Sequence, residues 1–283
     1  MTEMLLNGNS RARWRAVRLI QRRELRTMLF GFGLYVVIAL GLMAAILLLR
    51  NYLNFVQESG LLVMSGAFNF PLFAVIFLAA IYLAISSVTT IARERDQGTM
   101  EVLFYGPVDS ISYVLGKYLA QMATYLFMLL VFALCFGLFA GLTNFSFPGN
   151  VGWVVLLSIL VVSDVVAFSI FLSAQSSSVR TALFLFLSIL LGLILIQFGR
   201  EILSAIPVTG RYYNPVLFMQ NVLVNLNSVA RWVSPFSYLM QGMEAVRRGS
   251  MDMYAVLAAT SVLFSLLFLG LSVVLLERKG VRR

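Results

Sequence analysis

Long uncharged apolar runs constrain the fold of this chain more than any other feature. No Lys, Arg, Asp or Glu occurs at residues 27–49 or at residues 118–163. An apolar run of roughly 18 residues or more is expected to cross a membrane as a helix, because a helix satisfies its own backbone hydrogen bonds in lipid. Only 12% of the 283 residues are charged, whereas soluble domains average about 25%. The sequence therefore predicts an all-α integral membrane protein.

Six transmembrane helices are predicted within a single domain that covers residues 1–283. The spans are expected at residues 30–49, 70–91, 113–142, 151–174, 181–198 and 253–276. Residues 199–252 are less apolar and are predicted to form an external segment. Within that segment, Pro235 can begin a short external helix and Gly249 can end it. Gly137 and Gly141 have the spacing of close helix packing, inside the bundle or at a dimer contact.

A basic amphipathic helix is predicted at residues 11–29, ahead of the first span. At helical spacing Trp14 falls with other apolar residues on one face, and an adjacent stripe is formed by Arg11, Arg15, Arg18, Arg22 and Arg26. Such a helix is expected to lie in the membrane surface, with its apolar face at the acyl chains and its arginines on lipid phosphates. The alternative is a positive cluster that only orients the first span.

The positions of the basic residues predict the orientation of the chain. Fifteen of the 21 Lys and Arg residues fall on the side of a six-span arrangement that holds both termini. Because basic residues favour cytoplasmic loops, both termini and residues 93–117 are predicted to be cytoplasmic, in a multi-pass protein of the cytoplasmic (inner) membrane. The net charge of +9 is thereby assigned to orientation and to contact with membrane lipid, and no nucleic-acid partner is predicted. Because the chain has no histidine and one cysteine, no metal site is predicted.

A short charged island at residues 93–117 separates two long apolar blocks and holds four of the twelve acidic residues. Gly98 is expected to end the second span. Thr99 can cap a short helix at residues 98–106, and Pro107 can stop it.

This short helix would place three apolar side chains on one face, those of Met100, Leu103 and Phe104. Exposed at a cytoplasmic surface, such a face predicts a groove on a partner protein. Glu94 and Glu101 are expected to pair with basic residues of that partner or of the N-terminal helix.

The island resembles the signature of the ABC type-2 exporter permeases. The residues that carry the resemblance are Glu94, Gly98-Thr99-Met100-Glu101, Leu103, Pro107 and Gly116-Lys117. Arg23-Glu24-Leu25 and Tyr35 are similar to the gliding-motility and copper-maturation branches, and Ser234-Pro235-Phe236 resembles the family's external segment. The resemblance implies that residues 98–106 form a coupling helix that docks into an ATPase subunit. The alternative is an ordinary positive-inside loop whose glutamates balance its arginines.

The resemblance also implies partners. Gly116-Lys117 is followed by Tyr118 and lacks the frame of a phosphate-binding loop. The chain is therefore predicted to bind no cofactor and not to be an enzyme by itself, with ATP and Mg²⁺ on a separate nucleotide-binding ATPase subunit. A second permease copy or a homologous permease is implied as well, because one copy has six spans and one coupling element.

Asp164 is the one acidic residue inside a predicted span, about midway along the fourth. An ionisable group there costs about 2.5–3.5 kcal/mol on insertion scales, which indicates a role in the translocation path. Equally open is a structural role, in which Asp164 ties two helices together through Ser163 or Thr124. The resemblance further implies that an external gate is formed by Pro235, Phe236 and Tyr238.

Three other classes of function compete with an exporter permease. A secondary carrier or channel predicts several charges or broken helices at the membrane midplane, and this chain offers one, Asp164. An intramembrane protease needs a Ser–His pair or two paired Asp residues. The chain has no histidine, and only one Asp, Asp164, lies inside a predicted span. A membrane anchor for a cytoplasmic assembly would keep the docking island without substrate-stimulated ATP hydrolysis.

Overall fold

The computed structural model describes residues 2–59, 68–100, 109–143, 151–205, 218–219, 221–226 and 235–280. Within these ranges nearly every residue is helical and no strand occurs, which confirms the all-α prediction. In the described part of the chain, six helices are long and apolar enough to cross a membrane, as predicted. They are α2 (Phe32–Ser59), α3 (Asn69–Asp96), α5 (Ser110–Thr143), α6 (Val151–Gln175), α7 (Val179–Ala205) and α10 (Met251–Gly280).

The first of these helices, α2, is longer than the predicted span. It continues to Ser59, ten residues past the predicted end at residue 49. Residues 50–59 mix polar and apolar side chains but contain neither Gly nor Pro, so nothing in their backbone chemistry stops the helix. Hydropathy marks where a helix leaves the lipid, which need not be where the helix ends.

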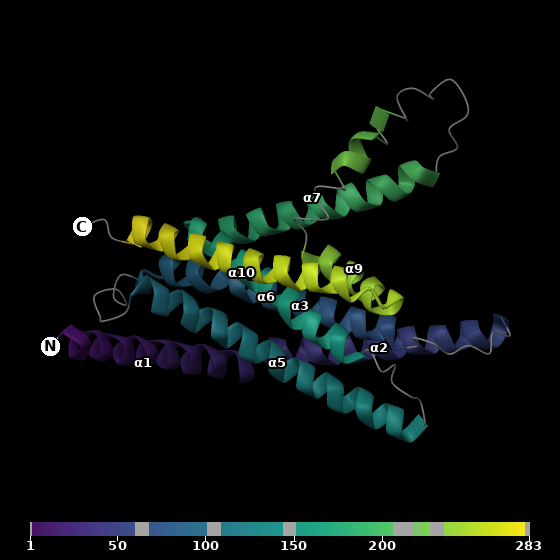
Figure 1. Ribbon diagram of the computed structural model, residues 1–283, viewed down its shortest axis with the longest axis horizontal. Coiled ribbons are helices and arrows are strands. Elements are labelled where there is room, and N and C mark those ends of the chain that lie inside the picture. The colour runs from purple at the N-terminus through teal and green to yellow at the C-terminus, as the bar shows by residue number, and fades with distance from the viewer. Residues whose placement is uncertain are drawn as a thin grey trace.

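At the centre of the bundle lies α6, which contacts α3, α5, α7, α9 and α10 (Figure 1). Most of its side chains are buried, including Leu157, Val161, Val166 and Ile170. Its sequence is apolar on every face, which suits a helix that is surrounded by other helices. The polar residues of α6 therefore reach neighbouring helices and not water.

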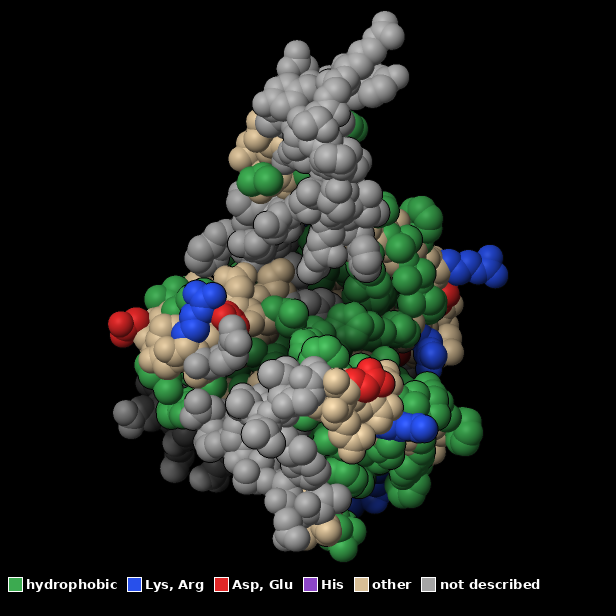
Figure 2. All heavy atoms as spheres, turned by 90° about the vertical axis from the view of Figure 1, so that its right-hand side faces the viewer, with side chains coloured by type: hydrophobic (Ala, Val, Ile, Leu, Met, Phe, Trp, Pro, Cys, Tyr) green, Lys and Arg blue, Asp and Glu red, His purple; other side chains and the backbone are tan. Residues whose placement is uncertain are grey.

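Other helices present apolar side chains to the outside of the bundle. Phe184, Leu191 and Leu195 of α7 are exposed, a surface suited to acyl chains or to another permease copy. Figure 2 shows the end of the bundle at the right of Figure 1, where hydrophobic side chains predominate and charged ones are few. Gly137 and Gly141 of α5 also face outward, because a Cβ added at either would meet no atom within 4 Å. The prediction that they pack closely inside the bundle is therefore wrong.

The N-terminal helix α1 (Thr2–Leu29) begins nine residues earlier than predicted. It runs in the same direction as α5 and alongside its first half (Figure 1). In order along both helices, the contacts are Arg13 with Asp109, Ile20 with Gly116, and Met28 with Thr124. Because Val17 and Met28 are buried in this contact, the prediction that the apolar face lies in the membrane surface is wrong for these residues. The predicted membrane-surface residues are exposed, namely Trp14, Arg15, Arg18, Arg22 and Arg26.

A short helix between the last two spans is confirmed as α9 (Pro235–Arg248). Gly249 ends it with a φ of +71°, in the left-handed region that glycine tolerates. The helix packs against α6 and α10 (Figure 1), so it is part of the bundle. Its position on the external side of the membrane stays a prediction. Gly242 makes the packing possible, since a Cβ there would lie 1.8 Å from Leu157 Cδ2. Sequence spacing could not reveal this approach because it depends on a residue 85 positions away.

Candidate functional site

The charged island begins where α3 ends. Gly98 has a φ of +68° and its N–H donates to the Arg95 carbonyl at 3.1 Å, which confirms it as the residue that ends the second span. The Thr99 hydroxyl donates to the Glu94 carbonyl at 3.1 Å, so it closes the same helix end. Its predicted role as a cap for the next helix involves residues 101–106, which lie outside the described residues.

Four charged side chains meet beside this helix end, three of them inside the bundle and the fourth, Arg23, at its surface. The Lys117 ammonium of α5 donates to Glu94 Oε1 of α3 at 3.0 Å and to Glu24 Oε1 of α1 at 2.8 Å. Arg23 Nη2 of α1 donates to the same Glu94 oxygen at 3.4 Å. We call Arg23, Glu24, Glu94 and Lys117 the charge cluster. Its two positive and two negative groups balance one another.

Because Lys117 and Glu94 are buried, each of them needs a partner of opposite charge. Lys117 is 1% exposed and Glu94 is 7% exposed, and a buried charge costs several kcal/mol unless it is paired and hydrogen-bonded. The Tyr113 hydroxyl also donates to Glu94, and Thr90 Oγ1 accepts from Lys117 at 3.1 Å. The charge cluster therefore holds α1, α3 and α5 in one mutual arrangement.

The charge cluster unites three segments that the sequence resemblance identifies separately. Arg23-Glu24 comes from the N-terminal helix, Glu94 from the start of the island and Lys117 from its end. Of the two partners predicted for Glu94, a separate protein or the N-terminal helix, the structure shows the helix, through Arg23. Sequence analysis missed Lys117 as the central cation, although a lysine at the edge of an apolar span is a recognisable signal.

The predicted docking face is only partly described. Met100 is 6% exposed and belongs to the main hydrophobic core, so the prediction that its side chain is exposed is wrong. Its place two residues after Gly98 turns it back against the bundle. The other predicted coupling residues, Glu101, Leu103, Phe104 and Pro107, lie outside the described residues.

The same end of α3 also holds the turn between α6 and α7. Arg95 Nη1 donates to the carbonyls of Ala174, at 3.2 Å, and of Ser176. The last carbonyls of a helix lack intrahelical partners, so Arg95 satisfies groups that α6 leaves open. Asp96 Oδ2 accepts the N–H of Val179, the first residue of α7, at 3.5 Å. Residues 94–96 thus connect α3 with α1 and α5 on one side and with α6 and α7 on the other.

Replacing Arg95 by methionine is expected to lower the free energy of unfolding by about 1–3 kcal/mol, because two carbonyls lose their charged donor. Arg93 is exposed on the same helix, so Arg93→Met is a matched control with an expected change within about 0.5 kcal/mol. Unfolding of the purified protein by sodium dodecyl sulfate, followed by circular dichroism, measures both. Equal effects of the two substitutions would contradict the role given to Arg95.

A second polar group lies in the middle of α6. Asp164 has no exposed surface. Its Oδ1 accepts from Ser265 Oγ at 2.7 Å and its Oδ2 accepts from Ser261 Oγ, both on α10. Ser265 Oγ lies 2.7 Å from Ser163 Oγ, which lies 2.6 Å from the Tyr118 hydroxyl of α5. A continuous hydroxyl chain therefore runs from Tyr118 of α5 through Ser163 of α6 and Ser265 of α10 to Asp164.

Asp164 thus ties helices together, which was one of its two predicted roles. Ser163 takes part through Ser265, whereas Thr124 bonds elsewhere, to the Ala120 carbonyl at 2.9 Å and to Met28. Sequence analysis missed Ser261 and Ser265. Their spacing of four residues in an apolar span puts them on one helix face, and that signal could have found them.

Tyr238, one of the predicted gate residues, lies near this group. It is 3% exposed in the main core. Burial chiefly, and the Asp164 carboxylate to a lesser extent, raise the pKa of Tyr238. Pro235 is the first residue of α9, and the side chains of Pro235 and Phe236 lie outside the described ones.

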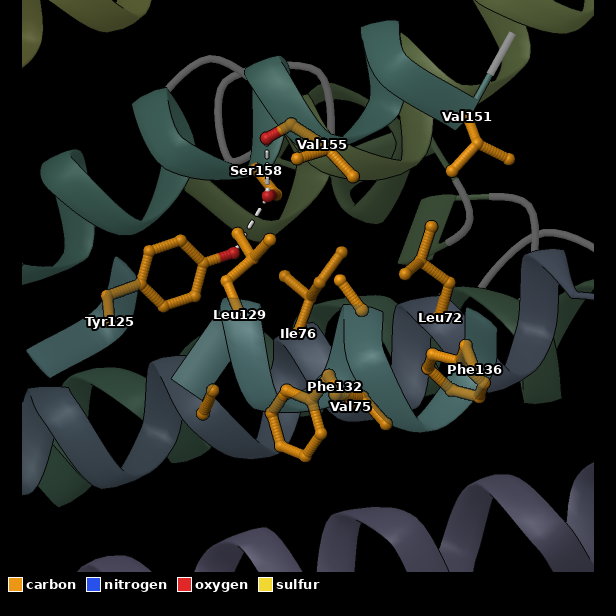
Figure 3. A pocket seen from close by; sticks show the side chains of 12 residues that line it. Leu72, Val75, Ile76, Tyr125, Leu129, Phe132, Phe136, Val151, Val155 and Ser158 are labelled. Carbon is orange, nitrogen blue, oxygen red and sulfur yellow. Dashed lines mark hydrogen bonds between the residues drawn. The ribbon is translucent and has the colours of Figure 1, made fainter. Parts of the chain in front are cut away.

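Two cavities flank the contact between α5 and α6. The α3–α5–α6 cavity has a volume of about 230 Å³ and almost wholly apolar walls (Figure 3). The α5–α6–α10 cavity has a volume of about 460 Å³. A tyrosine–serine hydrogen bond joins α5 to α6 beside each cavity, from Tyr125 to Ser158 at 2.7 Å in the first and between Tyr118 and Ser163 in the second.

Comparison with protein-family models matches residues 50–276 to the family described as ABC-2 family transporter protein. A comparison with curated proteins found no match. The matched region holds Glu94, Lys117 and Asp164, whereas Arg23 and Glu24 precede it. Since the match covers most of the chain, from the end of α2 into α10, the chain belongs to the ABC-2 transporter family and is a multi-pass permease component of an ABC transporter.

Proposed function

We propose that the chain is the permease subunit of an ATP-driven exporter and that residues 94–106 couple it to a separate ATPase subunit. ATP and Mg²⁺ would be held by that subunit, and a second permease, identical or homologous, would complete the translocation path. ATP binding would displace the segment after Gly98 and so change the side from which the path is accessible. Such a cycle requires ATP to bind the two states with different affinities.

The charge cluster is the observation that carries this proposal. The segment after Gly98 continues directly from α3, and Glu94 joins α3 to α1 and α5 four residues earlier. Pulling this helix end away from Lys117 would leave a buried charge unpaired, so α1, α3 and α5 are expected to move together. Packed interfaces of this kind switch between discrete arrangements, which suits the transmission of a motion.

Further contacts would spread the motion to the other helices. Arg95 and Asp96 reach the turn between α6 and α7, and Met100 anchors the start of the coupling segment in the core. Glu101, Leu103 and Phe104 remain the residues proposed to touch the ATPase subunit, on the strength of the sequence resemblance.

The proposal includes an orientation. The start of α1, the end of α3 and the end of α10 lie at one end of the bundle (Figure 1). Eleven of the 21 basic residues belong to the whole of α1 and to these two helix ends. Basic residues favour the cytoplasm, so both termini would be cytoplasmic in the cytoplasmic membrane. The part that Arg23 and Glu24 take in the charge cluster supports the gliding-motility and copper-maturation branch, because those residues carry the likeness to it.

Affinity purification of the tagged chain from its native membranes tests the coupling. A co-purifying protein with a phosphate-binding loop and ATPase activity is expected. Glu101→Lys should reduce its recovery at least tenfold, because it reverses a charge that is proposed to touch the ATPase subunit. Glu58→Lys makes the same charge change at the exposed end of α2 and should leave recovery unchanged. Full recovery and full ATPase activity with Glu101→Lys would contradict the proposed coupling.

A secondary carrier is the second candidate, and the buried Asp164 with its hydroxyl chain favours it. A carrier would move substrate down an ion gradient in vesicles depleted of ATP. The exporter requires ATP under the same gradient. Transport without ATP would therefore decide for the carrier.

A further inference from the structure

We propose that the α5–α6–α10 cavity binds an amphipathic amine, with its ammonium group at the hydroxyl chain and its apolar body along the walls. As a statement about transported substrate, this inference rests on the proposed function. As a statement about binding, it concerns this chain alone.

The size and position of the cavity fit such a molecule. Its volume of about 460 Å³ lies within the roughly 300–1,000 Å³ of small-molecule sites. The walls are aliphatic, from Leu115 of α5, Leu160 of α6 and Leu269 of α10 among others. Ile111 and Leu266 line the cavity and are also exposed on the outside of the bundle, so an apolar ligand can reach it from the lipid.

The hydroxyl chain determines which polar group the cavity accepts. Ser265 donates its one proton to Asp164 Oδ1, so in its contact with Ser163 it is Ser163 that donates. Ser163 then has no proton for Tyr118, and Tyr118 must donate to Ser163. All three hydroxyls line the cavity and direct their protons toward Asp164. Only oxygen lone pairs remain for a ligand, which must therefore be a hydrogen-bond donor.

The charge of the acid adds a preference for a cation. Asp164 forms no ion pair with any Lys or Arg in the described part of the chain. Its hydrogen bonds run to Ser261 and Ser265, which are neutral. In a surrounding of low dielectric an uncompensated carboxylate attracts positive charge strongly over a few ångströms. A group that is both cationic and a hydrogen-bond donor is an ammonium.

The α3–α5–α6 cavity provides an internal comparison. It has the same tyrosine–serine bond, from Tyr125 to Ser158, and similarly apolar walls (Figure 3). There, however, Ser158 donates to the Val155 carbonyl at 2.7 Å, and no acid follows. This cavity is therefore not expected to select an amine.

Fluorescence titration of the full-length chain in phosphatidylcholine nanodiscs with dansylcadaverine, a lipophilic primary amine, tests the proposal. Its N-acetyl derivative keeps the apolar body without the charge, and empty nanodiscs give the background. The amine is expected to bind at least tenfold more tightly than the derivative. Asp164→Asn and Tyr118→Phe should each weaken amine binding at least tenfold, and Tyr125→Phe should change it less than twofold. Equal binding of the two probes, or unchanged binding by Asp164→Asn, would show an unselective site for acyl chains and overturn the proposal.

A variant that fills the cavity keeps the test decisive if Asp164→Asn does not fold. A Cβ at Gly270 meets no atom within 4 Å and Gly270 lines the cavity, so Gly270→Phe should fold and lose amine binding. Gly192→Phe makes the same change at an equally open position of α7 and should bind as the natural chain does. Retained binding by Gly270→Phe would also overturn the proposal. The titration needs no ATPase subunit, so a lack of amine binding leaves the coupling proposal standing. If the chain binds the amine but Glu101→Lys does not affect recovery of the ATPase subunit, only the coupling proposal is overturned.

Discussion

Replacing Lys117 by methionine is expected to lower the free energy of unfolding by about 3–5 kcal/mol, the usual effect of removing one partner from a buried ion pair. Glu94 would remain buried with only Arg23, at 3.4 Å, as a cation. Glu24 would lose its 2.8 Å contact to α5, so α1 would lose its main polar attachment. We expect ATPase coupling to fall together with stability, because α1, α3 and α5 would no longer move as one unit. Unfolding in sodium dodecyl sulfate measures the first effect and substrate-stimulated ATP hydrolysis the second.

An exposed ion pair supplies the control for this substitution. Arg248 pairs with Glu244 at 2.7 Å within α9, and the arginine side chain is 72% exposed. Arg248→Met should change stability by no more than about 0.5 kcal/mol, because water screens such pairs. The double variant Glu94→Gln/Lys117→Met should be less destabilised than the sum of its single variants, since neither Glu94 nor Lys117 then stays buried without the other. A loss below 1 kcal/mol for Lys117→Met, or strict additivity in the double variant, would refute the assigned burial of the cluster.

Replacing Gly116 by leucine is expected to lower the free energy of unfolding by about 1–3 kcal/mol through overpacking. A Cβ at this position would lie 2.9 Å from Ile20 Cβ and 3.2 Å from the Val17 carbonyl oxygen. The carbonyl is backbone, so the clash is relieved only by moving α1 away from α5. That movement would separate Glu24 from Lys117, the next residue along α5. Thermal unfolding and crosslinking between cysteines placed on α1 and α5 measure the two consequences.

Gly137 is the matched control on the same helix. It is exposed, and a Cβ there meets no atom within 4 Å. Gly137→Leu should leave stability unchanged or raise it by up to about 1 kcal/mol, because leucine favours helix more than glycine does. The two substitutions therefore carry opposite expected signs. Equal destabilisation at both positions would mean that helix α5 as a whole, and not the contact with α1, is sensitive to side-chain volume.

Hydropathy, together with the glycines and prolines that begin or end helices, predicts the elements of this fold well, because both signals are local to one segment of the chain. The six spans, the end of α3 at Gly98 and the short helix from Pro235 to Gly249 all follow from such local signals. The errors share a different origin. Met100 was predicted to be exposed because sequence spacing shows which residues share a helix face but not what that face meets. The same reason explains why the packing of α9 against α6 and α10 was not predicted.

The candidate site was predictable only in part. The sequence marks Glu94 and Lys117 individually as candidate residues. It does not show that Lys117 binds Glu24, because these two residues lie 93 positions apart. Asp164 is visible as a charge in an apolar span, whereas its partners Ser261 and Ser265 lie about a hundred residues further on. Polar residues inside spans can be recognised in the sequence because burying a polar group in lipid costs free energy. Which of them pair is settled by helix packing.

The sequence alone determined that this chain is a bundle of membrane helices with a charged island between two of them. Apolar runs long enough to cross lipid have few other stable forms, so this conclusion needs no knowledge of contacts. Only the tertiary structure decided which helix lies at the centre. Both α6 and α7 are apolar on every face, yet α6 is mostly buried and α7 mostly exposed. Because lipid and protein interior are equally apolar, hydropathy cannot distinguish a buried helix from a lipid-exposed one. Only the contacts between distant segments show which helix is buried.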